Sequence, residues 1–162
     1  MKKKMLRLLL ELLKNSKRSD REIAKVLGVS QPTITRMRQR LVKEGAIQEF
    51  TVIPDFVKMG YEIMAITLTK SKMNLDPQEI GKATKVVLAN PNIIFVAQAE
   101  GMGKNGVMIS IHKSFSDFHN FLKDLISETK GYIENHETML IPLKGNIVKP
   151  LSLTYLGEQK ET

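Results

Sequence analysis

The chain has 162 residues, 42% of them hydrophobic, which is enough for one ordinary domain or two small ones with a real core. It has no cysteine, so disulfides and thiolate-held zinc or iron–sulfur sites are excluded, and this composition suits a reducing compartment. The formal net charge of +8 lies entirely in residues 1–50, with 13 Lys and Arg against 5 acids, which predicts a cationic module with a polyanionic partner followed by a neutral module.

The first predicted element is a helix over MLRLLLELLKN, residues 5–15, which follows the lysines at 2–4. Arg7 and Glu11 interrupt its apolar run, so a helix is favoured over a secretory signal. No later stretch approaches the ~18 uncharged apolar residues of a membrane helix, so we expect a cytoplasmic protein without a membrane partner. Leucines at i, i+3, i+4 and i+7 predict one buried stripe, made of Leu6, Leu9, Leu10 and Leu13. Further apolar residues widen it, which predicts cover on a second side: Met5, Leu8 and Leu12.

The next two helices are predicted from their caps. Ser19 with Glu22 three residues later forms a capping-box pattern, and Gly28 ends that helix. Only Gly28 and Val29 precede a second capping serine, Ser30, so the two helices meet at a sharp angle. This is a helix-turn-helix arrangement.

The third helix has an inner apolar row and an outer polar face. The outer face carries donors for phosphates and base edges, and these are our predicted DNA contacts: Gln31, Thr33, Thr35, Arg36, Gln39, Arg40 and Lys43. A solvated surface is the alternative for an arbitrary basic helix. The tight turn and the charge of the whole module favour double-stranded DNA as the partner.

The predicted fold class is α+β. Residues 1–48 form a winged-helix-like helix-turn-helix domain, and residues 49–60, with Pro54 and Gly60, form a linker. Residues 61–162 form the second domain. Its strand and helix patterns alternate as βαββαβ, the ferredoxin-like order, with helices starting near Asp76 and near Ser114 or Ser116. Residues 146–156 are predicted to add a fifth extended piece or a tail, because Pro150 suits only an edge.

The stretch GMGKNG at 101–106 fits a phosphate-binding G-x-G-x-x-G expression. In a dinucleotide site the glycines open a helix, whereas here the strand pattern VMISIH follows. The sequence therefore predicts a hairpin turn rather than a nucleotide site.

These residues together resemble the Lrp/AsnC, or feast/famine, family of prokaryotic transcription regulators. EIAKVLGVS is similar to the family's E-L-A-x-x-x-G-L-S, and FTVIPDFVKMGY resembles its linker. Five residues fall on the family pattern that follows the turn, up to a one-residue shift in the arginines: Arg36, Arg40, Leu41, Gly45 and Ile47. The resemblance implies a homodimer with packed sheets, two DNA-binding units reading a pseudo-palindromic site, and assembly up to octamers.

The resemblance also implies a small-molecule effector, commonly an amino acid, at the hairpin loop. The candidate residues are Gly101, Met102, Gly103, Lys104 and Asn105. The family commonly has an aspartate in this loop, which would pair with an α-ammonium group, whereas Lys104 would repel one. An anionic effector, or none, therefore stands beside an amino acid as an alternative.

Two other functions are alternatives to a sequence-specific regulator. A non-specific architectural, nucleoid-associated DNA-binding protein fits the basic module equally, and preference among DNA sequences is what separates it from a regulator. An enzyme is disfavoured, because the three histidines, His112, His119 and His136, belong to no catalytic or metal motif. We therefore expect no catalytic residues, no metal and no cofactor.

Overall fold

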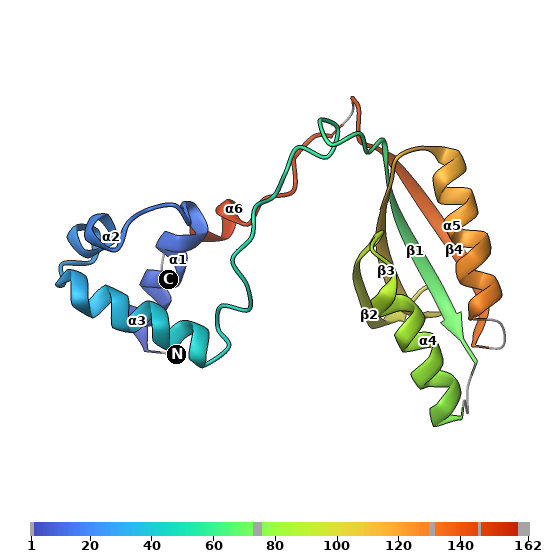
Figure 1. Cartoon of the computed structure of the whole chain (residues 1–162), viewed down its shortest axis with the longest axis horizontal. Helices are drawn as coiled ribbons and strands as arrows, with labels where there is room; N and C mark the ends of the chain where they lie inside the picture. The colour runs from blue at the N-terminus through green and yellow to red at the C-terminus, as the bar shows by residue number, and fades with distance from the viewer. Residues whose placement is uncertain (1, 73–75, 130–131, 146, 159–162) are drawn as a thin grey trace. The chain divides into compact units, whose positions relative to one another are not determined.

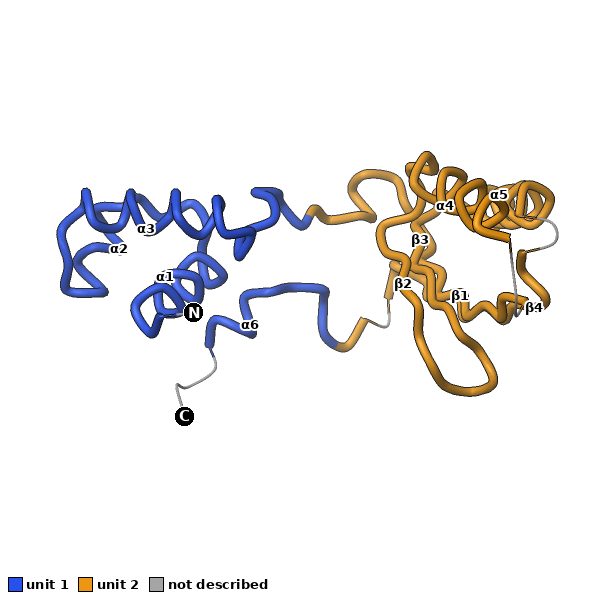
Figure 2. The backbone as a smooth tube through the Cα atoms, turned by 90° about the horizontal axis from the view of Figure 1, so that it is seen from below, with its two compact units in different colours: residues 1–53, 149–162 blue, residues 54–148 orange. Residues whose placement is uncertain are grey.

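The computed structural model describes residues 2–72, 76–129, 132–145 and 147–158. The chain divides into two compact units, which are coloured separately in Figure 2. Unit 1 consists of Met1–Ile53 with Lys149–Thr162, and unit 2 of Pro54–Val148. The predicted domains ended at residues 48 and 162, so the division differs mainly in the C-terminal segment, which is part of unit 1.

Unit 1 is built on three helices, α1 (Lys3–Lys14), α2 (Asp20–Leu27) and α3 (Gln31–Lys43). The capping box at α2 is present: the Glu22 backbone N–H donates to Ser19 Oγ at 3.3 Å, and the Ser19 N–H donates to the Glu22 carboxylate at 2.7 Å. Gly28 ends α2 in the left-handed region at φ 66°. Ser30 occupies the N-cap of α3, but its hydroxyl lies 2.8 Å from that of Thr33 instead of accepting from the backbone.

The predicted apolar stripe of α1 is wrong in phase. Its fully covered row is Met5, Leu8 and Leu12, whereas Leu6 is 39% exposed. Leu9, Leu10 and Leu13 are only half-buried. The inner row packs against α2 and α3, where the largest fully buried side chains of this core are Leu8, Ile23, Ile34 and Leu41. Seven of the nine residues from 5 to 13 are apolar, so the sequence does not decide which side of the helix is buried, and the neighbouring helices decide it.

The C-terminal segment is not a fifth extended piece of the sheet. Residues Thr154–Gly157 form a short helix, α6, that contacts α1. The turn before it is local, since Ser152 Oγ accepts from the Thr154 N–H at 3.1 Å. Gly157 is buried against α1, where a Cβ would lie 2.7 Å from the Leu10 carbonyl oxygen. The second side of α1 is thus covered by α6.

Unit 2 is a four-stranded antiparallel sheet covered by two helices. Its elements are β1 (Ile63–Ser71), α4 (Pro77–Ala89), β2 (Ile93–Gly101), β3 (Lys104–His112), α5 (Phe115–Glu128) and β4 (Ile133–Pro142). The strand order is β2-β3-β1-β4, which confirms the ferredoxin-like prediction. Figures 1 and 2 show α4 and α5 on one face of the sheet.

The core of unit 2 lies between that face and the helices. It contains Ala65 and Met108 from the sheet and Phe118, Phe121 and Leu125 from α5. Both helices start where their caps predict: Asp76 accepts from the Gln78 N–H at 2.9 Å, and Ser114 accepts from the Asp117 N–H at 3.1 Å. Among the described residues of unit 2, no helix lies on the opposite face of the sheet (Figure 2).

Candidate nucleic-acid interface

The helix α3 turns one side to the core and the other to solvent. Ile34 and Leu41 are fully buried. All seven side chains predicted to contact DNA lie on the remaining surface, with Thr33 and Thr35 half-buried and the others exposed: Gln31, Arg36, Gln39, Arg40 and Lys43. The structure therefore brings the predicted residues together on one helix face.

One edge of this face borders the start of α1. A groove of about 320 Å³ lies there, lined by Lys2, Lys4, Met5, Thr33, Arg36, Met37 and Arg40. Four of these side chains are cations, which is the charge that a phosphate backbone attracts. The sequence analysis did not include Lys2 and Lys4 among the candidate DNA contacts. The lysine run was the available signal, but only the crossing of α1 and α3 places it beside Arg36 and Arg40.

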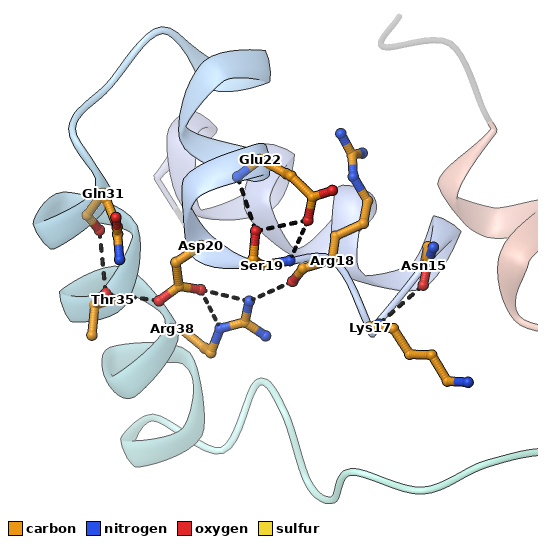
Figure 3. A network of polar contacts seen from close by, with 9 residues as sticks. All are labelled: Asn15, Lys17, Arg18, Ser19, Asp20, Glu22, Gln31, Thr35 and Arg38. Atoms are coloured by element: carbon orange, nitrogen blue, oxygen red, sulfur yellow. Dashed lines mark hydrogen bonds and ion pairs between the residues drawn. The ribbon is translucent and has the colours of Figure 1, made fainter.

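The other edge borders α2, and polar contacts tie it down (Figure 3). Arg38 donates to Asp20 Oδ1 from Nε at 2.9 Å and from Nη2 at 2.6 Å. Its Nη2 also reaches the Arg18 carbonyl oxygen at 3.4 Å. Thr35 Oγ1 donates to the second carboxylate oxygen, Asp20 Oδ2, at 2.7 Å. Arg38 is thus held within the unit, while Thr35 is both a member of the outward face and a partner of Asp20.

The surroundings of the Asp20 carboxyl favour its ionised form. Burial by itself favours its neutral form, but the hydrogen bonds from Thr35 and Arg38 and the charge of Arg38 outweigh burial and hold the pKa of Asp20 below its ordinary value. The Asp20 and Arg38 side chains keep only 19% and 22% of their exposure. An ion pair so shielded positions α3 against α2 more firmly than a surface pair could.

Other cations of the module are also engaged internally. Glu11, which is buried on α1, binds Lys14 at 2.6 Å and Arg18. The hydrogen bond from Lys14, with further help from Arg18, lowers the pKa of Glu11 against the opposing effect of burial. Arg40 lies 2.6 Å from Glu44, and both of these side chains are exposed. The net charge of the module therefore overstates the number of cations that are available to a ligand.

The GMGKNG segment forms the turn between β2 and β3. Met102 and Gly103 are the two loop residues, at φ 53° and 70°, and Gly101 pairs with Lys104. Two positive φ angles suit a type I′ hairpin turn. This confirms the predicted hairpin. A strand rather than a helix follows the glycines, so no helix N-terminus faces a phosphate here.

The five predicted effector residues divide into an exposed tip and a bonded base. Met102 at the tip is 84% exposed. Lys104 Nζ donates to Asn135 Oδ1 at 2.5 Å and lies 2.9 Å from Glu137 Oε1 on β4. The Asn105 amide pairs with the backbone of Ser71, accepting from its N–H at 2.8 Å. Sequence reasoning missed Glu137, because only the sheet register brings β4 next to this turn.

The distribution of acidic and histidine side chains and the length of the helices bear on metal binding and membrane insertion. Among the residues with described positions, no three His, Asp or Glu side chains gather as a metal would require. None of the helices in those same ranges is both long and apolar enough to span a bilayer.

Comparison with known proteins agrees with this geometry. The family model described as winged helix-turn-helix DNA-binding matches residues 1–48. The chain is 34% identical over 133 residues to the uncharacterized HTH-type transcriptional regulator PH0061 of Pyrococcus horikoshii, which covers 80% of this chain and 84% of the relative. The crystal structure of PH0061 superposes with a TM-score of 0.78 at 28% identity, over 94% of this chain and 97% of that one.

More distant structures share the fold. AsnC of E. coli matches with a TM-score of 0.73 at 18% identity, over 93% of this chain and 97% of AsnC. The regulator NMB0573 of Neisseria meningitidis, solved as a complex with L-Met, matches with a TM-score of 0.77 at 13% identity, over 96% of this chain and 99% of that one. PH0061 is an HTH-type transcriptional regulator, and the matching family model describes DNA binding. The helix-turn-helix unit, the βαββαβ unit and the PH0061 match identify the chain as a member of the Lrp/AsnC family of HTH-type transcriptional regulators.

Proposed function

We propose that this regulator works as a homodimer, and that each copy reads half of an operator in double-stranded DNA with α3. The observation that carries the proposal is the position of the cationic groove beside the outward face of α3. Lys2, Lys4 and Arg36 then contact phosphates and hold the helix in register. Gln39 and its neighbours on the exposed side of α3 reach base edges in the major groove. With DNA as its target, the protein acts in the cytoplasm, at the nucleoid.

The uncovered face of the sheet supports the dimer. Four apolar residues form one row across all four strands through the register Phe95↔Ile109, Ile109↔Ile66 and Ile66↔Met139. Their strand neighbours Ala65 and Met108 are buried under the helices, so this row lies on the opposite face. Phe95 is 49% exposed and Met139 67%. The same face of a second copy would remove this row from water, and further contacts between dimers would build an octamer.

The turn and its neighbours support a small-molecule effector site. The residues proposed for it are Gly101, Met102, Gly103, Lys104 and Asn105. Glu137 lies 2.9 Å from Lys104 and its side chain is 69% exposed, whereas the Lys104 side chain is only 8% exposed, so a ligand must separate this ion pair to reach Lys104. A zwitterionic amino acid would replace both partners at once, with its carboxylate at Lys104 and its ammonium at Glu137. NMB0573, which has the same fold, was crystallised with L-Met.

The experiment that tests the regulator is DNA binding over a salt series. Purified protein is titrated with DNA from upstream of its own gene and with random DNA of equal length. A preference of roughly 10³-fold or more for its own upstream DNA is expected of a sequence-specific, autoregulatory factor. Equal affinity for all sequences, including fragments selected from a genomic library, would indicate an architectural DNA-binding protein instead.

A further inference from the structure

The hydroxyl group of Thr35 has a single proton and two acceptors within reach. Asp20 Oδ2 lies at 2.7 Å and the Gln31 carbonyl oxygen at 3.2 Å. A hydroxyl donates only one hydrogen bond, and the shorter contact to a carboxylate is the stronger of the two. The Thr35 hydroxyl therefore donates its hydrogen bond to Asp20.

Asp20 cannot exchange roles with Thr35. An ionised carboxylate only accepts hydrogen bonds, so Asp20 cannot donate one to the Thr35 hydroxyl. Arg38 donates twice to Oδ1, which orients the carboxylate and leaves Oδ2 for Thr35 (Figure 3). The hydrogen-bond polarity of Thr35 is thus set from inside the protein, before any DNA is bound.

The remaining capacity of Thr35 is a lone pair and a methyl group. In the major groove, adenine and cytosine present an amino donor, whereas guanine presents only the acceptors N7 and O6. We infer that Asp20 is a specificity-determining residue. Because the Thr35 hydroxyl donates its one hydrogen bond to Asp20, it can only accept a hydrogen bond from DNA. Thr35 therefore accepts from the amino group of adenine or cytosine and discriminates against guanine. This inference rests on the proposed reading of DNA by α3.

A binding selection from randomised DNA tests this inference with four proteins: wild type, Thr35→Val, Asp20→Asn and Arg36→Ala. Thr35→Val keeps the shape and removes the oxygen, so it identifies the base position that Thr35 contacts. There the wild type should prefer adenine or cytosine over guanine by roughly three- to tenfold, the effect of one hydrogen bond. In Asp20→Asn the amide can donate to Thr35 and release its proton, so the preference against guanine should fall to within about twofold at this position alone.

Several outcomes would overturn the inference while leaving the regulator intact. They are an operator in which Thr35→Val alters no position, a wild-type preference for guanine or thymine at the altered position, or unchanged discrimination by Asp20→Asn. If the wild type selects no sequence, or if Arg36→Ala binds as tightly as wild type, the proposed reading of DNA by α3 fails as well. A change confined to one base position is a readout that a loosened fold does not produce.

If Asp20→Asn fails to fold, as judged by its thermal melting curve, chemically modified DNA gives the answer. The amino group at the identified base is deleted from a synthetic operator. Wild type and Thr35→Ser, which both keep the hydroxyl, should lose roughly three- to tenfold in affinity, and Thr35→Val should lose none. Equal losses in all three proteins would overturn the inference.

Discussion

Arg36 and Arg40 lie one turn apart on α3, but Arg40 forms an ion pair with Glu44, with Nε 2.6 Å from Oε1. Arg36→Ala should weaken operator binding by roughly tenfold or more and lower the salt slope by about one, because one phosphate or base contact is lost. Arg40→Ala should have a smaller effect, since Arg40 must leave Glu44 to reach DNA. Fluorescence anisotropy over a salt series measures both effects.

The matched control for the arginines is Lys85→Ala, which removes an exposed cation from α4 of unit 2. Its affinity and salt slope should equal those of wild type. Unchanged affinity and slope after alanine substitution at both Arg36 and Arg40 would contradict the assignment of α3 as the DNA-reading helix.

His112 makes the stability of unit 2 depend on pH. It is fully buried, its Nε2 lies 2.8 Å from Ser110 Oγ, and its ring lies 4.7 Å from that of Phe121. Burial lowers the pKa of His112 from its ordinary value of 6.5, and Asp117 opposes this only in part. Below pH 6.5 the unfolded chain binds a proton at this histidine that the folded chain does not bind. The free energy of unfolding is therefore highest above pH 6.5 and decreases as the pH falls from there towards the pKa of the folded state.

Urea unfolding at pH 7.5 and pH 5.5 checks this dependence. His112→Gln should lower stability at both pH values and should reduce the difference between them, because the titrating ring is gone. His119 is exposed on α5, and His119→Gln should keep the wild-type difference. An equal pH dependence in His112→Gln and wild type would show that other groups cause it.

At the residue scale, helical periodicity placed the candidate DNA contacts on one side of α3 correctly. Periodicity could not show that Thr35, unlike Arg36, hydrogen-bonds to Asp20. Asp20 is distant in sequence and comes near only when α2 packs on α3. The same holds for Lys104 and Glu137, which the sheet register brings to 2.9 Å. The sequence states which side chains are present, whereas the tertiary structure determines which of them contact one another.

At the scale of elements, the contact of α6 with α1 depends on a residue without a side chain. A Cβ on Gly157 would lie 2.7 Å from the Leu10 carbonyl oxygen and 2.8 Å from Lys14 Cγ. Gly157→Ala should therefore displace α6 and lower the free energy of unfolding by about 1–3 kcal/mol, as overpacking does. Hydrogen exchange should rise in α1 around Leu10, and thermal melting should give the loss of stability.

Gly81→Ala is the matched control for this substitution. Gly81 lies within α4, and apart from its chain neighbours and the helix's own backbone no described atom lies within 4 Å of an added Cβ. Alanine there should stabilise the protein by about 0.4–1 kcal/mol. If both variants gain stability equally, α6 does not pack on α1 as described.

The elements whose ends depend on local chemistry were the most predictable. Ser19 with Glu22, Gly28 and Asp76 each act on backbone groups within a few residues, so their sequence is sufficient. The phase of α1 and the course of residues 147–158 were missed. Each depends on which apolar face packs against an element that is remote in sequence, and the local sequence around Leu8 or Gly157 does not identify that element.

At the scale of the whole molecule, the apolar row of the sheet makes a prediction about assembly. Ile109 lies in the middle of that row and is half-buried within one copy. Ile109→Lys should place a charge in the proposed interface and convert the dimer to monomers in sedimentation velocity. Operator affinity should fall at least tenfold, because two half-sites can no longer be bound together.

Ile126→Lys is the control for assembly, since Ile126 is 37% exposed on α5, on the helical side of the sheet. It should remain dimeric and should bind DNA normally. A dimeric Ile109→Lys protein with a wild-type melting temperature would mean that the copies associate through another surface.

The sequence by itself determined the two modules, the helix-turn-helix, the ferredoxin-like order and the polarity of α3, because charge distribution, caps and hydrophobic periodicity act over short stretches of chain. Only the tertiary structure decided that Lys2 and Lys4 lie beside the candidate DNA-contact face of α3, that Thr35 donates its hydrogen bond to Asp20, that Glu137 lies beside Lys104, and that α6 packs on α1. Each of these is a contact between residues far apart in sequence, and its geometry is set by how helices and strands pack rather than by any local pattern.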